Sequence, residues 1–194
     1  RIPVAAGLGG GSSDAAATLA ALNTLWKLGL SLPELAGLGA RIGSDVPFFF
    51  HTPAAVGRGR GELLTPVSLP RPLHLVLVCP TEGVNTAEVY RNFSLSDPAG
   101  RRLIEPILKA LARGDSVALA KLLFNRLGAT ACQLCPDIAA AHDALRETGL
   151  AGPLVTGSGS ASFGLATDRR AAVEAARTIK ERFPGRVIVT RSTP

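Results

Sequence analysis

The apolar and polar positions of the first 70 residues predict two helices followed by a pair of strands. The first helix reaches about Lys27, because apolar residues recur at i, i+4, i+7 and i+11: Ala15, Leu19, Leu22 and Trp26. Gly29 ends that helix. Ser31 with Glu34 three positions later is a capping-box pattern, so a second helix is predicted to run to about Ile42.

The segment after the second helix predicts a turn and then a hairpin. Gly43-Ser44-Asp45 is typical of a turn at a helix exit. Apolar runs at 54–56 and 63–67 predict two strands that flank the glycine-rich segment 57–62. The arginines of that segment are also a feature of RNA-binding sequences, but the segment is too short for that function, and a hairpin turn is favoured.

The rest of the chain predicts a second domain of mixed helices and strands. Pro70-Arg71-Pro72 marks the expected boundary, and the apolar run at 73–79 predicts a buried strand. The later elements are helices at 86–92, 101–113, 115–124, 137–148 and 168–182, and strands at 153–156, 161–166 and 186–190. The sequence therefore predicts an α+β fold with domains at residues 1–70 and 71–194.

Composition narrows the class of partner. The chain has 21 Lys and Arg against 15 Asp and Glu, and its formal charge of +6 favours anionic ligands such as nucleotides and diphosphates. The arginines are scattered, so we expect no nucleic-acid partner. No apolar run is long enough to span a bilayer and no signal-peptide pattern opens the chain, so we expect a cytoplasmic protein without a membrane partner.

The three cysteines do not predict a metal or redox site. Cys132 and Cys135 form a C-x-x-C pair, and Cys79 lies in a predicted strand. Two thiols cannot complete a structural zinc site, and no histidine stands at ligand spacing from them. Because the pair precedes Pro136 without the strand-to-helix turn of a thioredoxin-like unit, we expect ordinary reduced cysteines.

A glycine-dense loop that runs directly into the first helix is the strongest candidate site. Glycines at positions 7, 9, 10 and 11 allow positive φ angles, and the helix start offers unpaired N–H groups to an anion such as phosphate. A Walker A loop is excluded because the stretch has no lysine, and a Rossmann fingerprint is excluded because Ser12 stands where the third glycine is required. The alternative is a plain glycine-rich connector.

Two further segments are candidates for chemistry. Asp45, on a turn before Val46-Pro47, is placed to accept a proton from a hydroxyl substrate, although a turn aspartate that only caps backbone amides is an equal alternative. The segment 155–164 is rich in glycine and serine and lies between two predicted strands. It predicts either a tight β-turn or a second part of the site.

The pattern Pro-x-x-x-Gly-Leu-Gly-x-Gly-Ser-Ser-x-Ala resembles the second signature motif of the GHMP kinases, and 155–164 resembles their third. The resemblance implies a ribosomal-protein-S5-like domain, here without its N-terminal part, followed by a ferredoxin-like domain. Within the superfamily, Gly-Leu-Gly-Gly-Gly-Ser-Ser-Asp-Ala-Ala and Gly43-Ser44-Asp45-Val46-Pro47 are most similar to the kinases that phosphorylate the 2-hydroxyl of cytidine diphosphate-linked methylerythritol in the non-mevalonate isoprenoid pathway.

The same resemblance assigns roles to particular residues. Asp45 is the implied catalytic base. The implied ATP-binding residues are Pro3, Val4, Ala5, Ala6, Gly7, Leu8, Gly9, Gly10, Gly11, Ser12 and Ser13. The implied substrate-binding residues are Thr86, Tyr90, Gly157, Ser158 and Gly159, although Ala87 stands where family members often have proline. ATP and Mg²⁺ are the implied cofactors; no metal ligand is assigned, and Ser12 or Ser13 is the candidate.

Two other functions stay open at this point. The first is a GHMP kinase for a different alcohol, of the mevalonate or homoserine type. The second is a non-catalytic module of the same fold that binds a nucleotide or RNA. The main prediction is an enzyme with a small-molecule substrate, and the sequence does not determine its oligomeric state.

The chain has no methionine and begins at Arg1, and with the resemblance this implies an upstream segment that carries strands and a lysine for phosphoryl transfer. We therefore expect the 194-residue chain alone to be inactive and prone to aggregation, because an uncovered sheet edge and apolar face associate. Light scattering after size-exclusion chromatography measures this. A monomer with one cooperative unfolding transition would contradict it.

Overall fold

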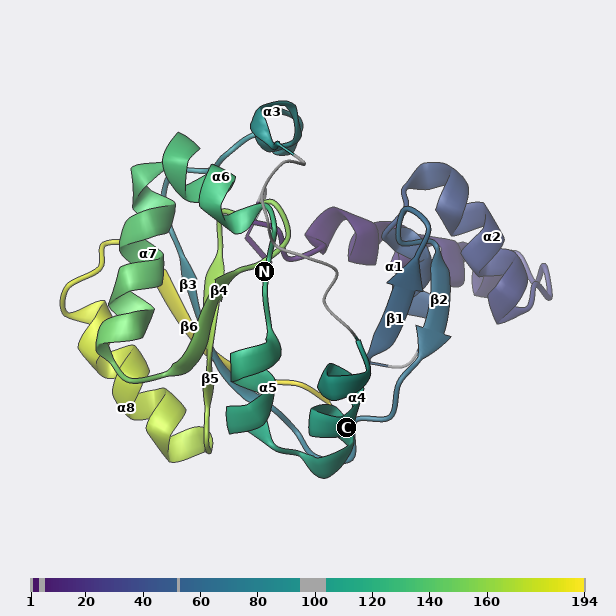
Figure 1. Cartoon of the computed structure of the whole chain (residues 1–194). Coiled ribbons are helices and arrows are strands. Elements are labelled where there is room, and N and C mark those ends of the chain that lie inside the picture. The colour runs from purple at the N-terminus through teal and green to yellow at the C-terminus, as the bar shows by residue number, and fades with distance from the viewer. Residues whose placement is uncertain (1, 4–5, 52, 95–103, 194) are drawn as a thin grey trace. The chain divides into compact units, whose positions relative to one another are not determined.

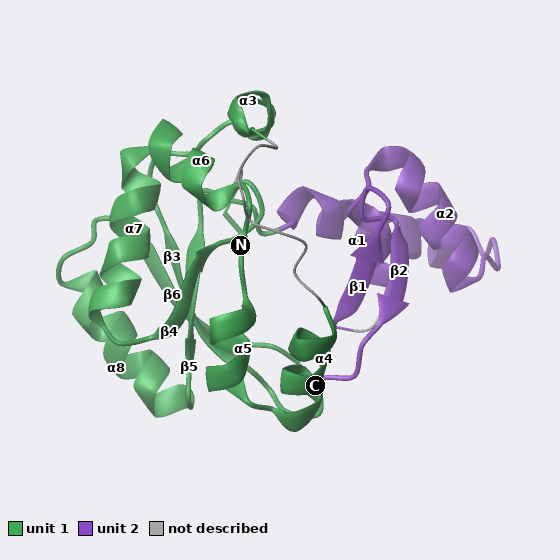
Figure 2. Cartoon of the chain, viewed as in Figure 1, with its two compact units in different colours: residues 1–8, 70–194 green, residues 9–69 purple. Residues whose placement is uncertain are grey.

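The structure is a computed structural model that describes residues 2–3, 6–51, 53–94 and 104–193 (Figure 1). The chain divides into two compact units, coloured separately in Figure 2. The larger unit contains residues 1–8 and 70–194, and the smaller contains 9–69. The glycine-dense loop therefore begins in the larger unit and continues into the smaller one. The division into domains at 1–70 and 71–194 stays a prediction.

The smaller unit contains both predicted helices and the predicted hairpin. Its elements are α1 (Gly10–Leu25), α2 (Leu32–Ile42), the 3-10 helix η1 (Val46–Phe50), β1 (Ala55–Arg58) and β2 (Leu63–Pro66). The capping box is confirmed, because the Ser31 N–H donates a hydrogen bond to the Glu34 carboxylate at 2.8 Å. Hydrogen bonds from the Ser31 side chain and then its backbone N–H lower the pKa of Glu34.

The first helix forms where it was expected, but its apolar face is only partly covered. Ala16 is its one fully buried residue, and Ala15, Leu19 and Leu22 are half-buried. Trp26 is 61% exposed and follows the last helical residue. The helix therefore ends before the predicted Lys27, and Trp26 lies just beyond it. Among the described residues, no helix combines the length and apolarity needed to cross a membrane.

The larger unit is built on a four-stranded antiparallel sheet. Its strands are β3 (His74–Cys79), β4 (Ala151–Val155), β5 (Ser162–Ala166) and β6 (Arg186–Arg191), in the spatial order β4-β5-β3-β6. Helices lie between β3 and β4 and between β5 and β6, whereas β4 and β5 are joined by a turn. This β-α-β-β-α-β order is that of a ferredoxin-like domain, as predicted.

The helices of the larger unit follow the predicted order with one addition. They are α3 (Thr86–Asn92), α4 (Glu105–Arg113), α5 (Ser116–Leu122), α6 (Gly128–Leu134), α7 (Pro136–Glu147) and α8 (Arg169–Lys180). The predicted residues 101–103 of the fourth helix lie outside the described residues. The short helix α6 was not predicted, because its seven residues are too few to establish an apolar period.

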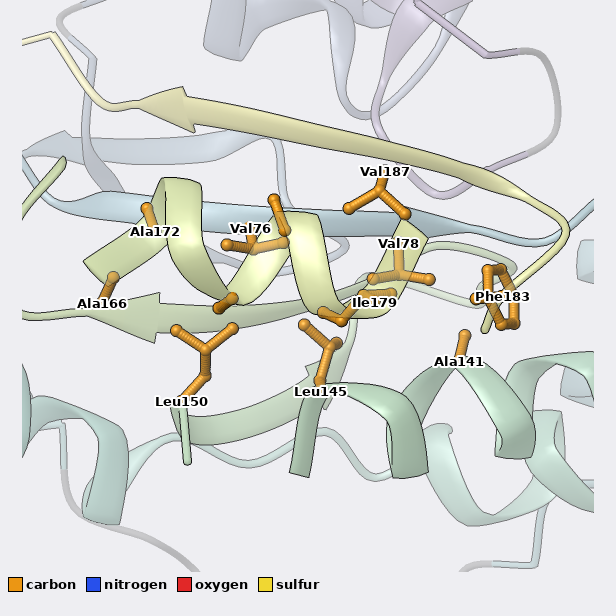
Figure 3. Packing of buried hydrophobic residues seen from close by; sticks show 12 residues of the cluster. Val76, Val78, Ala141, Leu145, Leu150, Ala166, Ala172, Ile179, Phe183 and Val187 are labelled. Carbon is orange, nitrogen blue, oxygen red and sulfur yellow. The ribbon is translucent and has the colours of Figure 1, made fainter. Parts of the chain in front are cut away.

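The core of the larger unit follows from strand alternation. Val76 and Val78 share one face of β3 and pack with Leu145 of α7 and Ile179 of α8, as Figure 3 shows. Leu75, directly before Val76, lies on the opposite face, in the cluster formed with α4 and α5. The sheet is thus covered on both faces, with α7 and α8 on one side and α4 and α5 on the other.

Ser162 places a polar side-chain atom inside this core, and its removal should affect the stability of the protein. Its side chain is 0% exposed, between the strand partners Val78 and Val155, and its Oγ has no hydrogen-bond partner among the described residues. Ser162→Ala in the full-length protein should leave the free energy of unfolding unchanged or raise it by about 1 kcal/mol, since an unpaired buried hydroxyl is unfavourable. Urea denaturation measures the change.

Ser158→Ala is the matched control. This serine is also buried, but its Oγ shares a hydrogen bond of 2.8 Å with the Thr86 hydroxyl. Its removal should lower the free energy of unfolding by about 1 kcal/mol. A Ser162→Ala variant that is destabilised as much as Ser158→Ala would show that the Ser162 hydroxyl makes a favourable interaction.

Candidate functional site

The glycine-dense loop begins by packing against the sheet of the larger unit. Ala6 is buried in a small apolar cluster with Cys79, at the end of β3, and Ala161, just before β5. The Ala6 carbonyl accepts a hydrogen bond from the Ala161 N–H at 3.1 Å. The Gly7 carbonyl accepts one from the Thr156 hydroxyl at 2.9 Å. The predicted ATP loop and the predicted Gly-Ser turn are therefore in direct contact.

Gly7 is the position where this contact requires glycine. Its φ of +68° lies in the left-handed region, which side chains with a Cβ rarely adopt. A Cβ at this position would also overlap the Thr156 carbonyl oxygen and lie 2.9 Å from the Gly159 carbonyl oxygen. Backbone atoms cannot rotate away as a flexible side chain can, so the close approach of the loop and the turn depends on the missing side chain.

The second half of the loop forms the N-terminus of α1. Gly9, with φ +66°, is the N-cap, and no side chain caps the helix start. Of the four glycines that allow a positive φ, Gly7 and Gly9 adopt it, whereas Gly10 and Gly11 are already helical. The open first-turn N–H groups, at the positive end of the helix dipole, are suited to bind an anion.

The two serines of the loop, Ser12 and Ser13, lie in the first turn of α1. The Ser13 hydroxyl donates to the Gly10 carbonyl at 2.7 Å, within the first turn of α1. Ser12, beside it, is half-buried. Pro3, Ala6 and Leu8 are among the described residues, whereas the predicted ATP-binding residues Val4 and Ala5 lie outside them.

Asp45 lies on the predicted turn, in the smaller unit. It precedes η1, whose residues Val46 and Pro47 are buried against α2, and its side chain is exposed. Within the same unit, Phe49 of η1 lies beside Gly9, because a Cβ on Gly9 would be 3.0 Å from the Phe49 ring. The helix η1, which follows Asp45, thus packs against the start of α1.

The predicted substrate-binding residues lie in the larger unit, and two of them are in contact. Thr86 and Ser158 share the hydrogen bond of 2.8 Å between their hydroxyls, which joins α3 to the Gly-Ser turn. Tyr90, on α3, is 61% exposed. Gly157 and Gly159 both have positive φ, of 56° and 93°.

The departure at Ala87 has a structural consequence at the start of α3. Asn85 is the N-cap of this helix, and its side chain accepts a hydrogen bond from the Ala87 N–H at 2.9 Å. Proline has no N–H, so the proline that family members often carry here could not make this bond. The cap fixes the start of α3 at Thr86.

Two contact residues of the site were missed by the sequence analysis. Thr156 lay within the recognised Gly-Ser segment, but nothing in its local pattern indicated a bond to Gly7. Asn125 donates from Nδ2 to the carbonyl oxygens of Val155 and Gly157 at 2.7 and 2.6 Å. A single asparagine between two helical patterns carries no motif, so its role emerges only from the tertiary contacts.

The cysteines and the acidic residues are possible metal ligands, since the sequence contains a C-x-x-C pair. All three cysteines are free thiols, and burial raises the pKa of Cys132, with smaller effects of Asp143 and Cys135 in the same direction. Burial also raises the pKa of Cys79. In the part of the chain that the structure describes, no group of three or more His, Cys, Asp or Glu residues is arranged to hold a metal ion.

Comparison with known proteins identifies the family. The family model for the GHMP kinases N terminal domain matches residues 1–52, and that for the GHMP kinases C terminal domain matches residues 107–185. A curated 4-diphosphocytidyl-2-C-methyl-D-erythritol kinase of Moorella thermoacetica is 44% identical over 99% of this chain and 68% of its own length. The chain belongs to the GHMP kinases.

Two further relatives carry the same name. The 4-diphosphocytidyl-2-C-methyl-D-erythritol kinase of Shouchella clausii is 47% identical over 165 residues, which cover 85% of this chain and 55% of that protein. A crystal structure of 4-(cytidine 5'-diphospho)-2C-methyl-D-erythritol kinase matches with a TM-score of 0.83 and 39% identity, over 100% of this chain and 69% of that one. The chain thus spans little more than half the length of some curated relatives.

Gly7→Ala tests whether the loop and the turn require glycine at their contact. In the full-length protein we expect a loss of about 2 kcal/mol or more in the free energy of unfolding, because a positive φ and an overlap with backbone atoms are both unfavourable. Gly37→Ala is the control, since Gly37 lies in α2 with no atom within 4 Å of an added Cβ.

Thermal and urea unfolding compare the two variants. The control should be neutral or more stable by about 1 kcal/mol, because alanine favours a helix interior over glycine. Equal effects of the two substitutions would mean that the Gly7 contact contributes nothing specific.

Proposed function

We propose that the chain is part of an ATP-dependent kinase that phosphorylates the 2-hydroxyl of 4-diphosphocytidyl-2-C-methyl-D-erythritol, a step of non-mevalonate isoprenoid synthesis. The observation that carries the proposal is the glycine loop, held by Thr156 at Gly7 and leading into the uncapped start of α1. Relatives 44% and 47% identical to the chain bear the name of this kinase, which supports the choice of substrate.

The start of α1 would bind the ATP phosphates. The N–H groups of Gly10, Gly11 and Ser12 have no side-chain cap, and an oxyanion at this position gains both hydrogen bonds and the favourable helix dipole. Catalysis of phosphoryl transfer depends mainly on such positioning and charge stabilisation. The loop thus supplies the part of the site that holds the reacting phosphate.

Mg²⁺ fits this arrangement through oxygen ligands. The Ser12 hydroxyl is half-buried at the helix start, and the Ser13 Oγ keeps lone pairs after donating its hydrogen to Gly10. Mg²⁺ commonly binds one or two protein oxygens together with substrate phosphates and waters, so a cluster of acidic residues is not required. When bound, the ion would neutralise phosphate charge.

Asp45 would act as the general base. Its exposed carboxylate on the turn before η1 is free to approach a substrate hydroxyl. In the proposed step the substrate 2-hydroxyl oxygen bonds to the γ-phosphorus, the bond from that phosphorus to the bridging oxygen of ADP breaks, and the hydroxyl proton moves to an Asp45 oxygen.

The cytidine end of the substrate would bind at α3 and the Gly-Ser turn. Tyr90 has an exposed ring suited to stack on a cytosine, and Thr86 lies against Ser158 of the turn. Gly157 and Gly159 let the turn backbone approach a ligand closely. We place the reaction in the cytoplasm, with a small molecule as the only substrate besides ATP.

An assay of the full-length protein with ATP and a panel of alcohols tests this function. We expect phosphorylation of the cytidylyl substrate in preference to mevalonate and homoserine. Asp45→Asn should lower kcat by a factor of about 10² to 10⁴, since the amide cannot take the proton, while ATP binding stays close to that of the wild type.

Asp143→Asn provides the control. It removes a carboxylate outside the proposed site, which forms an exposed ion pair with Arg146 at 3.5 Å, so turnover should not change. Preference for another alcohol would refute the substrate assignment. Unchanged turnover of Asp45→Asn would remove Asp45 from the mechanism, and ATP binding without any phosphoryl transfer in the wild type would indicate a binding module.

A further inference from the structure

Asn125 lies between α5 and α6, and its amide group holds the Gly-Ser turn at two points. Its Nδ2 donates hydrogen bonds to the carbonyl oxygens of Val155 at 2.7 Å and Gly157 at 2.6 Å. Its Oδ1 accepts a hydrogen bond from the Leu127 N–H at 2.9 Å. The two carbonyls stand on either side of Thr156, so one side chain restrains the backbone both before and after that residue.

The chemistry of these partners requires an amide at position 125. A carbonyl oxygen only accepts and a backbone N–H only donates, so the amide nitrogen must face the turn and the amide oxygen must face Leu127. Aspartate would keep the acceptor but would set a carboxylate oxygen against two carbonyl oxygens. Alanine would deprive both carbonyls of this donor.

Thr156 transmits this restraint to the glycine loop. Its hydroxyl donates to the Gly7 carbonyl at 2.9 Å, and its own N–H donates to the Ala161 carbonyl at 2.9 Å. The Ala161 N–H in turn donates to the Ala6 carbonyl at 3.1 Å. The position of the loop therefore depends on the position of Thr156, which depends on the two carbonyls that Asn125 binds.

We infer that Asn125 is a positioning residue for the phosphate-binding loop. The inference rests on the proposed kinase function, because it assigns to the loop the binding of ATP phosphates. Asn125 acts through Thr156 and Gly7. Without its amide the turn has more than one conformation, the loop loses its single geometry, and ATP binds more weakly.

Asn23 offers a matched control within the same chain. Near the C-terminal end of α1, its Nδ2 donates to the Leu30 carbonyl at 3.0 Å and its Oδ1 accepts from the Leu30 N–H at 3.0 Å. Asn23→Ala thus removes hydrogen bonds of the same kind, from an amide side chain that also binds the backbone of a loop, at Leu30. Neither partner belongs to the glycine loop or to the Gly-Ser turn.

The test measures equilibrium ATP binding and amide hydrogen exchange in the full-length protein and its variants. For Asn125→Ala we expect about tenfold weaker ATP binding and about tenfold faster exchange at the Thr156, Gly159 and Ala161 amides, the effect of losing net hydrogen-bond energy at the turn. Asn23→Ala should leave both quantities as in the wild type.

Asn125→Asp adds a pH dependence that a general loss of stability would not produce. The carbonyl oxygens of Val155 and Gly157 disfavour a carboxylate at this position, whereas the protonated acid can donate one hydrogen bond. Cys132, His142, Asp143 and Arg146 line the same pocket, and because the wild type shares them, affinities are compared relative to the wild type at each pH. The ATP affinity of Asn125→Asp relative to the wild type should therefore rise as the pH is lowered from about 7.5 to about 5, whereas the relative affinity of Asn125→Ala should stay constant.

The two proposals fail in different ways. Wild-type ATP affinity and wild-type exchange in Asn125→Ala would overturn the role of Asn125. Effects of equal size in Asn23→Ala would also overturn it, because they would reflect general destabilisation. A wild-type protein that binds no ATP would instead refute the proposed function, and the exchange rates at Thr156 and Ala161 would still decide whether Asn125 holds the turn.

Discussion

The packing of the first loop residues on the Gly-Ser turn is the constraint on which the candidate site depends. Two hydrogen bonds, from the Thr156 hydroxyl to Gly7 and from the Ala161 N–H to Ala6, join segments about 150 residues apart in the chain. They hold the first half of the loop against the sheet of the larger unit. Because a loop binds an anion well only if its N–H groups are held in one arrangement, the candidate site depends on this contact.

The Gly-Ser turn can support the loop because several of its polar groups are hydrogen-bonded to other parts of the larger unit. Ser158 and Ser160 are buried, and the turn carbonyls at 155 and 157 both receive hydrogen bonds from Asn125. Buried backbone groups without partners would be unfavourable, so the turn cannot shift without breaking several bonds together. The apolar cluster that packs α3, α6 and α7 against the end of β4 holds these partners in place.

Short-range patterns predicted most of the fold. Two short helices and the exposure of one tryptophan were not predicted, for two physical reasons. The capping box at Ser31 and the alternation of Val76 and Val78 are properties of neighbouring residues, so the sequence displays them directly. The helices η1 and α6 are too short to show a period. The exposure of Trp26 could not be predicted either, because an apolar residue at helical spacing is buried only if another element covers it.

By itself the sequence determined the class of the chain, since the spacing of its glycines, serines and Asp45 belongs to one kinase family. It also placed the phosphate loop ahead of a helix. Only the tertiary structure decided which glycines take left-handed angles and which side chains hold the loop. Glycine permits both signs of φ, and the bonds from Thr156 and Asn125 depend on strand register and on contacts between distant segments, which no local pattern encodes.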